Sequence, residues 1–256
     1  MKYLLLFIVL NYTYVISAQE THVIEPSQLE VRYKVKLDMT KNPGDLYILR
    51  CGKNVSEYFS FYTLRRDSLM NSSDKSAQDM ILDEDYEAAI HRDEPNKQLP
   101  ESPGCSDYLY RYIKKGKLVS YSPIFDTNYR IEENTPFIDW KINEDSTLEV
   151  CGYKCYYAQT DFRGRKWQVW FTSDIPLSIG PWKLGGLPGL ILKAECTNYI
   201  HIDAIELLSK NLSPVTFYNF YKFKFEDIDR LKFLRVRNNP KSYPSKTRII
   251  PTMELK

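Results

Sequence analysis

The chain is 256 residues long, which is enough to bury a substantial core in one large domain or two small ones. Its 35 basic and 33 acidic residues nearly cancel, so the overall charge gives no support to a nucleic-acid-binding function. The 20 tyrosines and 12 phenylalanines favour β-structure, because aromatic side chains fit pleated, half-buried surfaces.

Residues 1–18 have the pattern of a signal peptide. Lys2 gives a positive start, an apolar run follows over 3–15, and 16–18 form a small-residue cleavage site before Gln19. The run is short for a membrane span of roughly 20 residues, and a retained anchor is the alternative. No later stretch is long and apolar enough to cross a bilayer. We therefore expect residues 19–256 to be an exported single domain, periplasmic or extracellular, and not an integral membrane protein.

Alternating apolar and polar residues predict strands along most of the remaining chain. The clearest run is 29–37, where every second residue is apolar. A turn at 41–44 leads to a second strand at 45–53, which indicates an antiparallel hairpin. Further strands are predicted at 108–112, 118–121, 125–131, 137–142, 147–157, 166–172, 190–195 and 201–208.

Two segments interrupt this pattern. Residues 67–92 carry apolar side chains near helical spacing and predict one or two amphipathic helices, and a further helix is predicted at 226–237. The predicted fold is therefore mainly antiparallel β, a curved sheet or half-barrel with one or two flanking helices, in the α+β class.

The most unusual stretch is Ile175–Leu192, which contains three prolines and four glycines among large apolar side chains. No regular element tolerates that mixture, and a solvated loop would not be so apolar. We expect a packed loop that crosses the sheet. Within it, Trp182 and Lys183 could form an aromatic and cationic contact surface, and the alternative is that Trp182 fills the core beneath its own loop.

The segment Gly186-Leu187-Pro188-Gly189-Leu190-Ile191 carries a resemblance to a known family. This chain resembles the GLPGLI proteins, exported proteins of Bacteroidetes-type bacteria that are also described through a Porphyromonas gingivalis-type domain. Further blocks between 137 and 196 match in the same order, at 140–142, 152–155, 162–165 and 180–183. The resemblance implies no assigned enzymatic activity, and it places family members beside outer-membrane transport and surface proteins.

Five cysteines lie in the part expected to be exported, where disulfides can persist: Cys51, Cys105, Cys151, Cys155 and Cys196. The odd number leaves at least one unpaired within the chain. Cys151 and Cys155 are expected on one face of one strand, so the favoured disulfide joins one of them to Cys196 on a neighbouring strand. A zinc site is the alternative, but a lone C-x3-C is a poor metal signature, and no metal or cofactor is predicted.

The residues that could carry chemistry are few. Arg163 and Arg165 flank a turn glycine and could clamp an anion or carboxylate, or form a solvated hairpin tip. The histidines lie in unlike settings, no G-x-S-x-G is present, and no residue is assigned as catalytic. A nucleophilic Cys155 would need a lowered pKa and a histidine partner.

These observations favour a non-enzymatic binding or assembly protein of the cell envelope, acting through the concave sheet or the 175–192 loop. Its expected partner is an outer-membrane or other envelope protein, or a small ligand. Two alternatives stay open: an envelope hydrolase or thiol-dependent enzyme that uses Cys155 or His201, and a metal carrier that uses the clustered cysteines.

Overall fold

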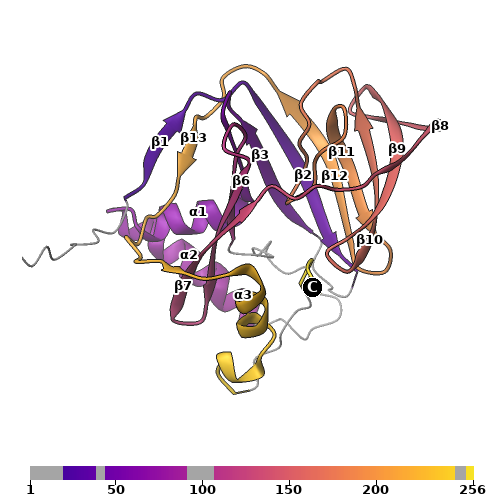
Figure 1. The fold of residues 1–256 in the computed structure, drawn as a ribbon. Coiled ribbons are helices and arrows are strands. Elements are labelled where there is room, and N and C mark those ends of the chain that lie inside the picture. The colour runs from indigo at the N-terminus through magenta and orange to yellow at the C-terminus, as the bar shows by residue number, and fades with distance from the viewer. Residues whose placement is uncertain (1–19, 39–43, 91–106, 246–251) are drawn as a thin grey trace, which may run out of the picture.

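The computed structural model describes residues 20–38, 44–90, 107–245 and 252–256. In this part of the chain, twelve strands form one sheet and two more form a small sheet (Figure 1). The strands are β1 (His22–Glu25), β2 (Leu29–Leu37), β3 (Asp45–Cys51), β4 (Val55–Ser60), β5 (Tyr108–Tyr112), β6 (Lys117–Ile124), β7 (Thr127–Asn134), β8 (Lys141–Val150), β9 (Tyr153–Phe162), β10 (Arg165–Thr172), β11 (Leu190–Cys196), β12 (Ile200–Leu208), β13 (Val215–Phe217) and β14 (Glu226–Asp227).

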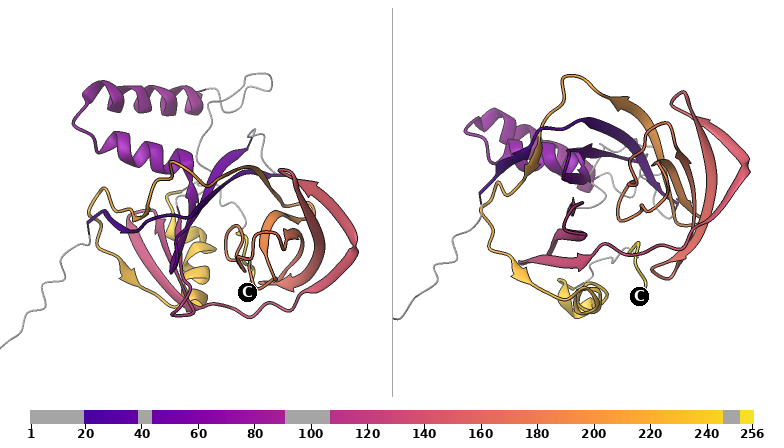
Figure 2. Two further views of the ribbon diagram at one scale, coloured as in Figure 1. Left: turned by 90° about the horizontal axis from the view of Figure 1, so that it is seen from above. Right: turned by 45° about the horizontal axis from the view of Figure 1, so that its top comes forward.

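The large sheet consists of two antiparallel meanders that share one seam. Strands β2–β7 are neighbours in chain order, as are β8–β12, and β2 pairs with β12 between the two sets. The short β14 adds to the edge of β7 in parallel orientation. Strands β8–β12 curl strongly, and the sheet does not close into a barrel (Figure 2). The predicted fold class, a mainly antiparallel curved sheet or half-barrel with flanking helices, is confirmed.

Three α-helices lie outside the sheet in the described residues: α1 (Phe61–Met70), α2 (Lys75–Ile90) and α3 (Arg230–Arg237), with a short 3-10 turn at Pro240–Ser242. Helix α1 begins directly after β4 because the Ser60 hydroxyl accepts a hydrogen bond from the Thr63 amide at 3.3 Å. Helices α1 and α2 overlap the region 67–92, where one or two helices were expected, and α3 lies within the expected helix at 226–237. In the described ranges, no helix has the length and apolar character needed to cross a membrane.

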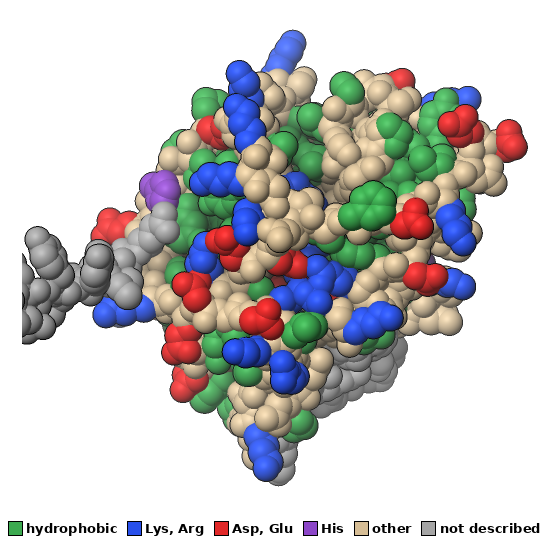
Figure 3. All heavy atoms as spheres, viewed as in Figure 1, with side chains coloured by type: hydrophobic (Ala, Val, Ile, Leu, Met, Phe, Trp, Pro, Cys, Tyr) green, Lys and Arg blue, Asp and Glu red, His purple; other side chains and the backbone are tan. Residues whose placement is uncertain are grey.

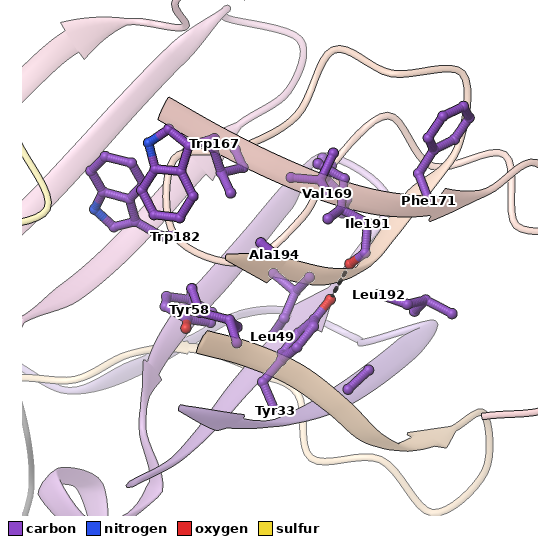
Figure 4. Packing of buried hydrophobic residues seen from close by; sticks show 14 of the residues in the cluster. Tyr33, Leu49, Tyr58, Trp167, Val169, Phe171, Trp182, Ile191, Leu192 and Ala194 are labelled. Atoms are coloured by element: carbon purple, nitrogen blue, oxygen red, sulfur yellow. Dashed lines mark hydrogen bonds between the residues drawn. The ribbon is translucent and has the colours of Figure 1, made fainter. Parts of the chain in front are cut away.

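The main core fills the concave face of the sheet (Figure 4). Alternate residues of β2 and β10 point into it, including Val31 and Tyr33 from one strand and Trp167 and Val169 from the other, all fully buried. The opposite face of β2 was expected in water, but Glu30 on that face is buried as well. The alternating pattern therefore located β2 correctly and misjudged how much of its second face is covered.

The segment 173–189, between β10 and β11, lies against this concave face as a packed loop. Ile179, Leu184 and Leu187 are buried in the main core. Side chains of β2 and β5, and Trp140 just before β8, donate hydrogen bonds to backbone carbonyls of the loop and of β11. Trp140 Nε1 donates to the Gly185 carbonyl at 2.8 Å, Arg111 donates to the Leu184 carbonyl at 3.0 Å, and the Tyr33 hydroxyl donates to the Ile191 carbonyl at 2.7 Å. Hydrogen bonds of this kind allow an irregular segment to be buried.

Local strand boundaries differ from the sequence predictions in the region of β8. Residues 137–140 precede the strand instead of forming part of it, and the turn expected at 143–146 is a register shift inside β8. The single strand expected at 147–157 is divided by a turn, in which Cys151 has a φ of 51°. The polar residues at 143–146 suggested a turn, and the apolar residues at 137–140 and 147–157 suggested continuous strands.

Gly189 provides a sharp test of the packed loop. A Cβ atom at this position would lie 2.0 Å from the Thr172 carbonyl oxygen, whereas at Gly186 the nearest atom is 3.8 Å away. Gly189→Ala should therefore reduce the free energy of unfolding by about 3 kcal/mol. Gly186→Ala, whose φ of 87° brings backbone strain alone, should cost about 1–2 kcal/mol. Urea unfolding of the two variants measures the difference, and equal losses would contradict the close packing of Gly189 on β10.

Candidate functional site

The 173–189 loop directs two neighbouring side chains into different environments. Trp182 stacks on Trp167, with ring centroids 5.4 Å apart, and meets Phe162 edge-on at 5.9 Å. It is 9 % exposed, so it occupies the core position that was one of its two expected roles (Figure 4). Lys183 is also buried, but its ammonium group reaches carboxylates at the open side of the curled sheet.

Lys183 belongs to a cluster of five charged side chains that we call the mouth cluster: Glu133, Arg163, Lys183, Arg230 and Glu254. Lys183 Nζ lies 2.6 Å from Glu133 Oε1 and also binds Glu254. Arg163 pairs with Glu133, and Arg230 NH1 lies 2.9 Å from Glu254 Oε2. Three cations thus share two carboxylates.

The mouth cluster joins five segments that are distant in sequence. Glu133 is on β7, Arg163 is in the turn between β9 and β10, and Lys183 is on the loop. Arg230 begins α3, and Glu254 lies in the segment 252–256. The cluster therefore connects the last long strand of one meander to the other meander. Figure 3 shows basic and acidic side chains next to one another near the centre of the face that it draws.

Arg165 contributes to the same region by holding the backbone of the 252–256 segment. Its Nε and NH2 groups donate to the Thr252 carbonyl at 3.1 and 2.5 Å. Its guanidinium also lies 3.5 Å from the centroid of the Tyr199 ring, a cation–π contact. Of these two arginines, Arg163 thus pairs with carboxylates of this chain, whereas Arg165 binds a backbone carbonyl.

The electrostatics of the mouth cluster favour bound carboxylates. Burial alone would raise the pKa of Glu254, but Lys183, Arg163 and Arg230 outweigh that effect and lower it below its usual value. Glu254 is consequently ionised at neutral pH. A site of this composition can bind and orient an acidic group, and charge-assisted hydrogen bonds from Arg and Lys give it both strength and direction.

The cysteines do not form the expected bridge. Cys51, Cys151, Cys155 and Cys196 are free thiols, and Cys105 lies outside the described residues. The strand register explains why Cys155 and Cys196 are not joined. Tyr156 pairs with Phe171, and Thr172 pairs with Leu190, so Cys155 is level with the start of β11, whereas Cys196 ends it. That offset is about 20 Å along the strand, and a disulfide needs Cα atoms within about 7 Å.

His201 lies on β12 at the sheet surface, with its side chain 40 % exposed. Its Nε2 is 3.2 Å from Asp38 Oδ1, and its Nδ1 is 3.6 Å from Glu195 Oε2. Both ring nitrogens face carboxylates, which leaves neither directed at a nucleophile. Across the described ranges, no group of three or more His, Cys, Asp or Glu side chains is arranged to hold a metal ion.

A second charged cluster was missed by the sequence analysis. Arg50 on β3 donates to Glu30 on β2 at 2.8 Å and to Glu57 on β4 at 3.1 Å, and it also donates to the Tyr218 hydroxyl at 2.7 Å. All three charged groups are almost fully buried. In sequence they occupy the polar positions of alternating strands, which are indistinguishable from a solvated face. The segment around 215–225 packs over these side chains, and its many aromatic residues are the one sequence clue that this face of the sheet is covered.

The comparisons with known proteins concern the stretch that builds the loop. Residues 157–193 match a family model described as "Protein of unknown function (Porph_ging)". The expected resemblance is confirmed for this segment. The matched segment is shorter than the region 137–196 over which the resemblance was expected. It contains Arg163, Arg165, Trp182 and Lys183. No curated protein matches the chain.

Solved structures support the fold. Two crystal forms of PNGF-II match with TM-scores of 0.53 and 0.51, at 14 % sequence identity and over 85 % of this chain. The chain spans about a third of the length of those proteins, 33 % and 32 % respectively. At this identity the similarity shows a shared β-rich architecture.

The buried Glu57 makes the stability depend on pH. Burial raises the pKa of Glu57 to about 8, although Arg50 and the Thr216 amide oppose that shift. Between its ordinary pKa of 4.5 and about 8, the folded state holds a proton that the unfolded state releases, so stability should fall as the pH rises through this window. Glu57→Gln should flatten the pH dependence of Tm between pH 5 and 8. An unchanged slope would contradict the raised pKa.

Thiol labelling tests the environments of the cysteines. Burial raises the pKa of Cys51 to about 12 and that of Cys155 to about 11, whereas Cys151 is exposed. Among the four cysteines that the structure describes, iodoacetamide should therefore label Cys151 first in the native protein, and Cys51 and Cys155 only on unfolding. Peptide mapping by mass spectrometry separates the sites. Labelling of native Cys155 as fast as Cys151 would instead indicate an activated thiol.

Proposed function

We propose that the protein is an exported, non-enzymatic binding or assembly protein of the cell envelope, with the mouth cluster as its contact site. The observation that carries the proposal is the shared cluster of Arg163, Lys183 and Arg230 with two carboxylates. Export rests on the signal-peptide pattern of residues 1–18, and the envelope role rests on the family resemblance. The expected partner is an outer-membrane or other envelope protein, or a small ligand.

The packing of the loop supports the mouth as the contact site in preference to the concave face. Ile179, Leu184 and Leu187 fill the concave face from within, so that surface is occupied by the chain itself. Trp182 is likewise committed to the core by its stack on Trp167. The charged side chains beside the loop lie at the edge of this core, and Arg230 is the most exposed of the mouth cluster at 18 %.

The alternative activities receive less support. A thiol-dependent enzyme needs a thiolate near neutral pH, and burial raises the pKa of Cys155 to about 11. A hydrolase that uses His201 needs a nucleophile beside the ring, where Asp38 and Glu195 lie instead. A metal carrier would need clustered ligands, and the strand register separates Cys155 from Cys196.

Capture of envelope proteins by the purified chain tests the proposed contact site. Arg230→Gln removes a partly exposed cation of the mouth cluster, and Arg130→Gln is the matched control, since Arg130 forms a surface ion pair with Asp227 at 2.7 Å. Arg230→Gln should lower partner recovery about tenfold, which corresponds to one lost charge-assisted hydrogen bond. Quantitative mass spectrometry of the captured proteins provides the measurement. Equal recovery with both variants would rule out the mouth cluster, and circular dichroism verifies that each variant is folded.

A further inference from the structure

The segment 252–256 lies on the mouth cluster as a peptide ligand would. We propose that the site recognises an extended, acidic peptide segment of a partner protein, and that Thr252–Lys256 is the occupant that such a segment replaces. This inference rests on the proposed function, because it names the class of partner for the same site. Four observations carry it: backbone pairing, a buried acidic side chain, a close fit at one glycine and an excess of positive charge.

The backbone of the segment is held at both ends of the β9–β10 turn. The Leu255 amide donates to the Arg163 carbonyl at 2.9 Å, and the Thr252 carbonyl accepts from Arg165. Arg230 NH1 also donates to the Lys256 carbonyl at 3.0 Å. Contacts to main-chain atoms bind any extended peptide irrespective of its side chains, which is the usual source of affinity in strand-like peptide recognition.

The acidic side chain of the segment provides the selectivity. Glu254 is 6 % exposed and is the one residue of the segment that enters the mouth cluster, where it binds Lys183 and Arg230. Met253 packs on the main core, whereas Leu255 is 56 % exposed. A peptide therefore needs an acidic residue after an apolar one, and the following side chain is free to vary.

The turn is shaped to admit this backbone. Gly164 has a φ of 80°, and a Cβ atom there would lie 2.9 Å from Leu255 Cβ. A side chain at 164 would therefore push the segment away from the turn.

The mouth cluster carries more positive charges than negative ones, even with Glu254 of the segment in place. Three cations face two carboxylates, and without Glu254 they would face Glu133 alone. Arg163 Nε is buried, and no described residue accepts a hydrogen bond from it. A site with surplus cationic donors favours an acidic occupant over a neutral one, because an unpaired buried charge is costly.

A tethered occupant competes strongly with a free peptide. Its effective concentration is on the order of millimolar, so a free peptide of equal intrinsic affinity binds the intact site weakly. Weakening the tethered segment should consequently improve the binding of a peptide in trans. This relation makes the proposal testable with the full-length chain.

The experiment measures the fluorescence anisotropy of a labelled Thr-Met-Glu-Leu-Lys peptide with the full-length protein. Glu254→Gln should bind the peptide about tenfold more tightly than the wild type, since its own segment competes less well. A peptide with Gln in place of Glu should bind Glu254→Gln about tenfold more weakly. Glu226→Gln, a substitution at an exposed glutamate on β14, is the matched control and should behave as the wild type.

Hydrogen exchange of the wild-type protein gives a second measurement that needs no variant. Millimolar peptide should accelerate amide exchange in the 252–256 segment, including the Leu255 amide that Arg163 protects. Equal binding of the Glu and Gln peptides, or unchanged exchange at saturating peptide, would overturn the inference.

The outcomes distinguish this inference from the proposed function. If the peptide does not bind but envelope capture still depends on Arg230, the mouth cluster is a contact site for another kind of ligand and the peptide inference is wrong. If the peptide binds but capture is the same for Arg230→Gln and Arg130→Gln, the site recognises peptides and its proposed role in envelope binding is wrong.

Discussion

A strongly curled sheet leaves an apolar concave face that something must cover, and the 173–189 loop meets that requirement. Its buried side chains supply the apolar surface, and its backbone would be costly to bury without the donors that Tyr33, Trp140 and Arg111 provide. The stack of Trp182 on Trp167 joins loop and strand directly. Because the loop fills the curl, its own side chains occupy the concave face.

The mouth cluster depends on the same loop. Lys183 emerges from the loop beside Trp182, so the same turn of chain that completes the core also places a cation at the open side. Buried ion pairs give little net stability, since desolvation offsets the attraction. Here they join the loop to β7 and to the segment 252–256, and they join that segment to α3.

Strand-level features were predictable from sequence, whereas the polar contacts between distant segments were not. The alternation at 29–37 located β2 correctly, and the proline and glycine spacing at 175–192 indicated a packed loop. The pairing of Lys183 with Glu133 and Glu254 depends on three segments meeting in space, which no local pattern encodes. The cysteine prediction failed for the same reason, because it needed the register of β9, β10 and β11 and the sequence suggests only that they are strands.

The seam between β2 and β12 sets the order in which the sheet can form. Each meander pairs strands that follow one another, so each can assemble from a continuous stretch of chain. The seam joins residues such as Arg32 and Glu206, which are 174 positions apart along the chain. Contacts of such separation form slowly because a long loop must close first. The first meander can therefore form before the second, and the continuous sheet must wait for β12, which completes the second meander and pairs with β2.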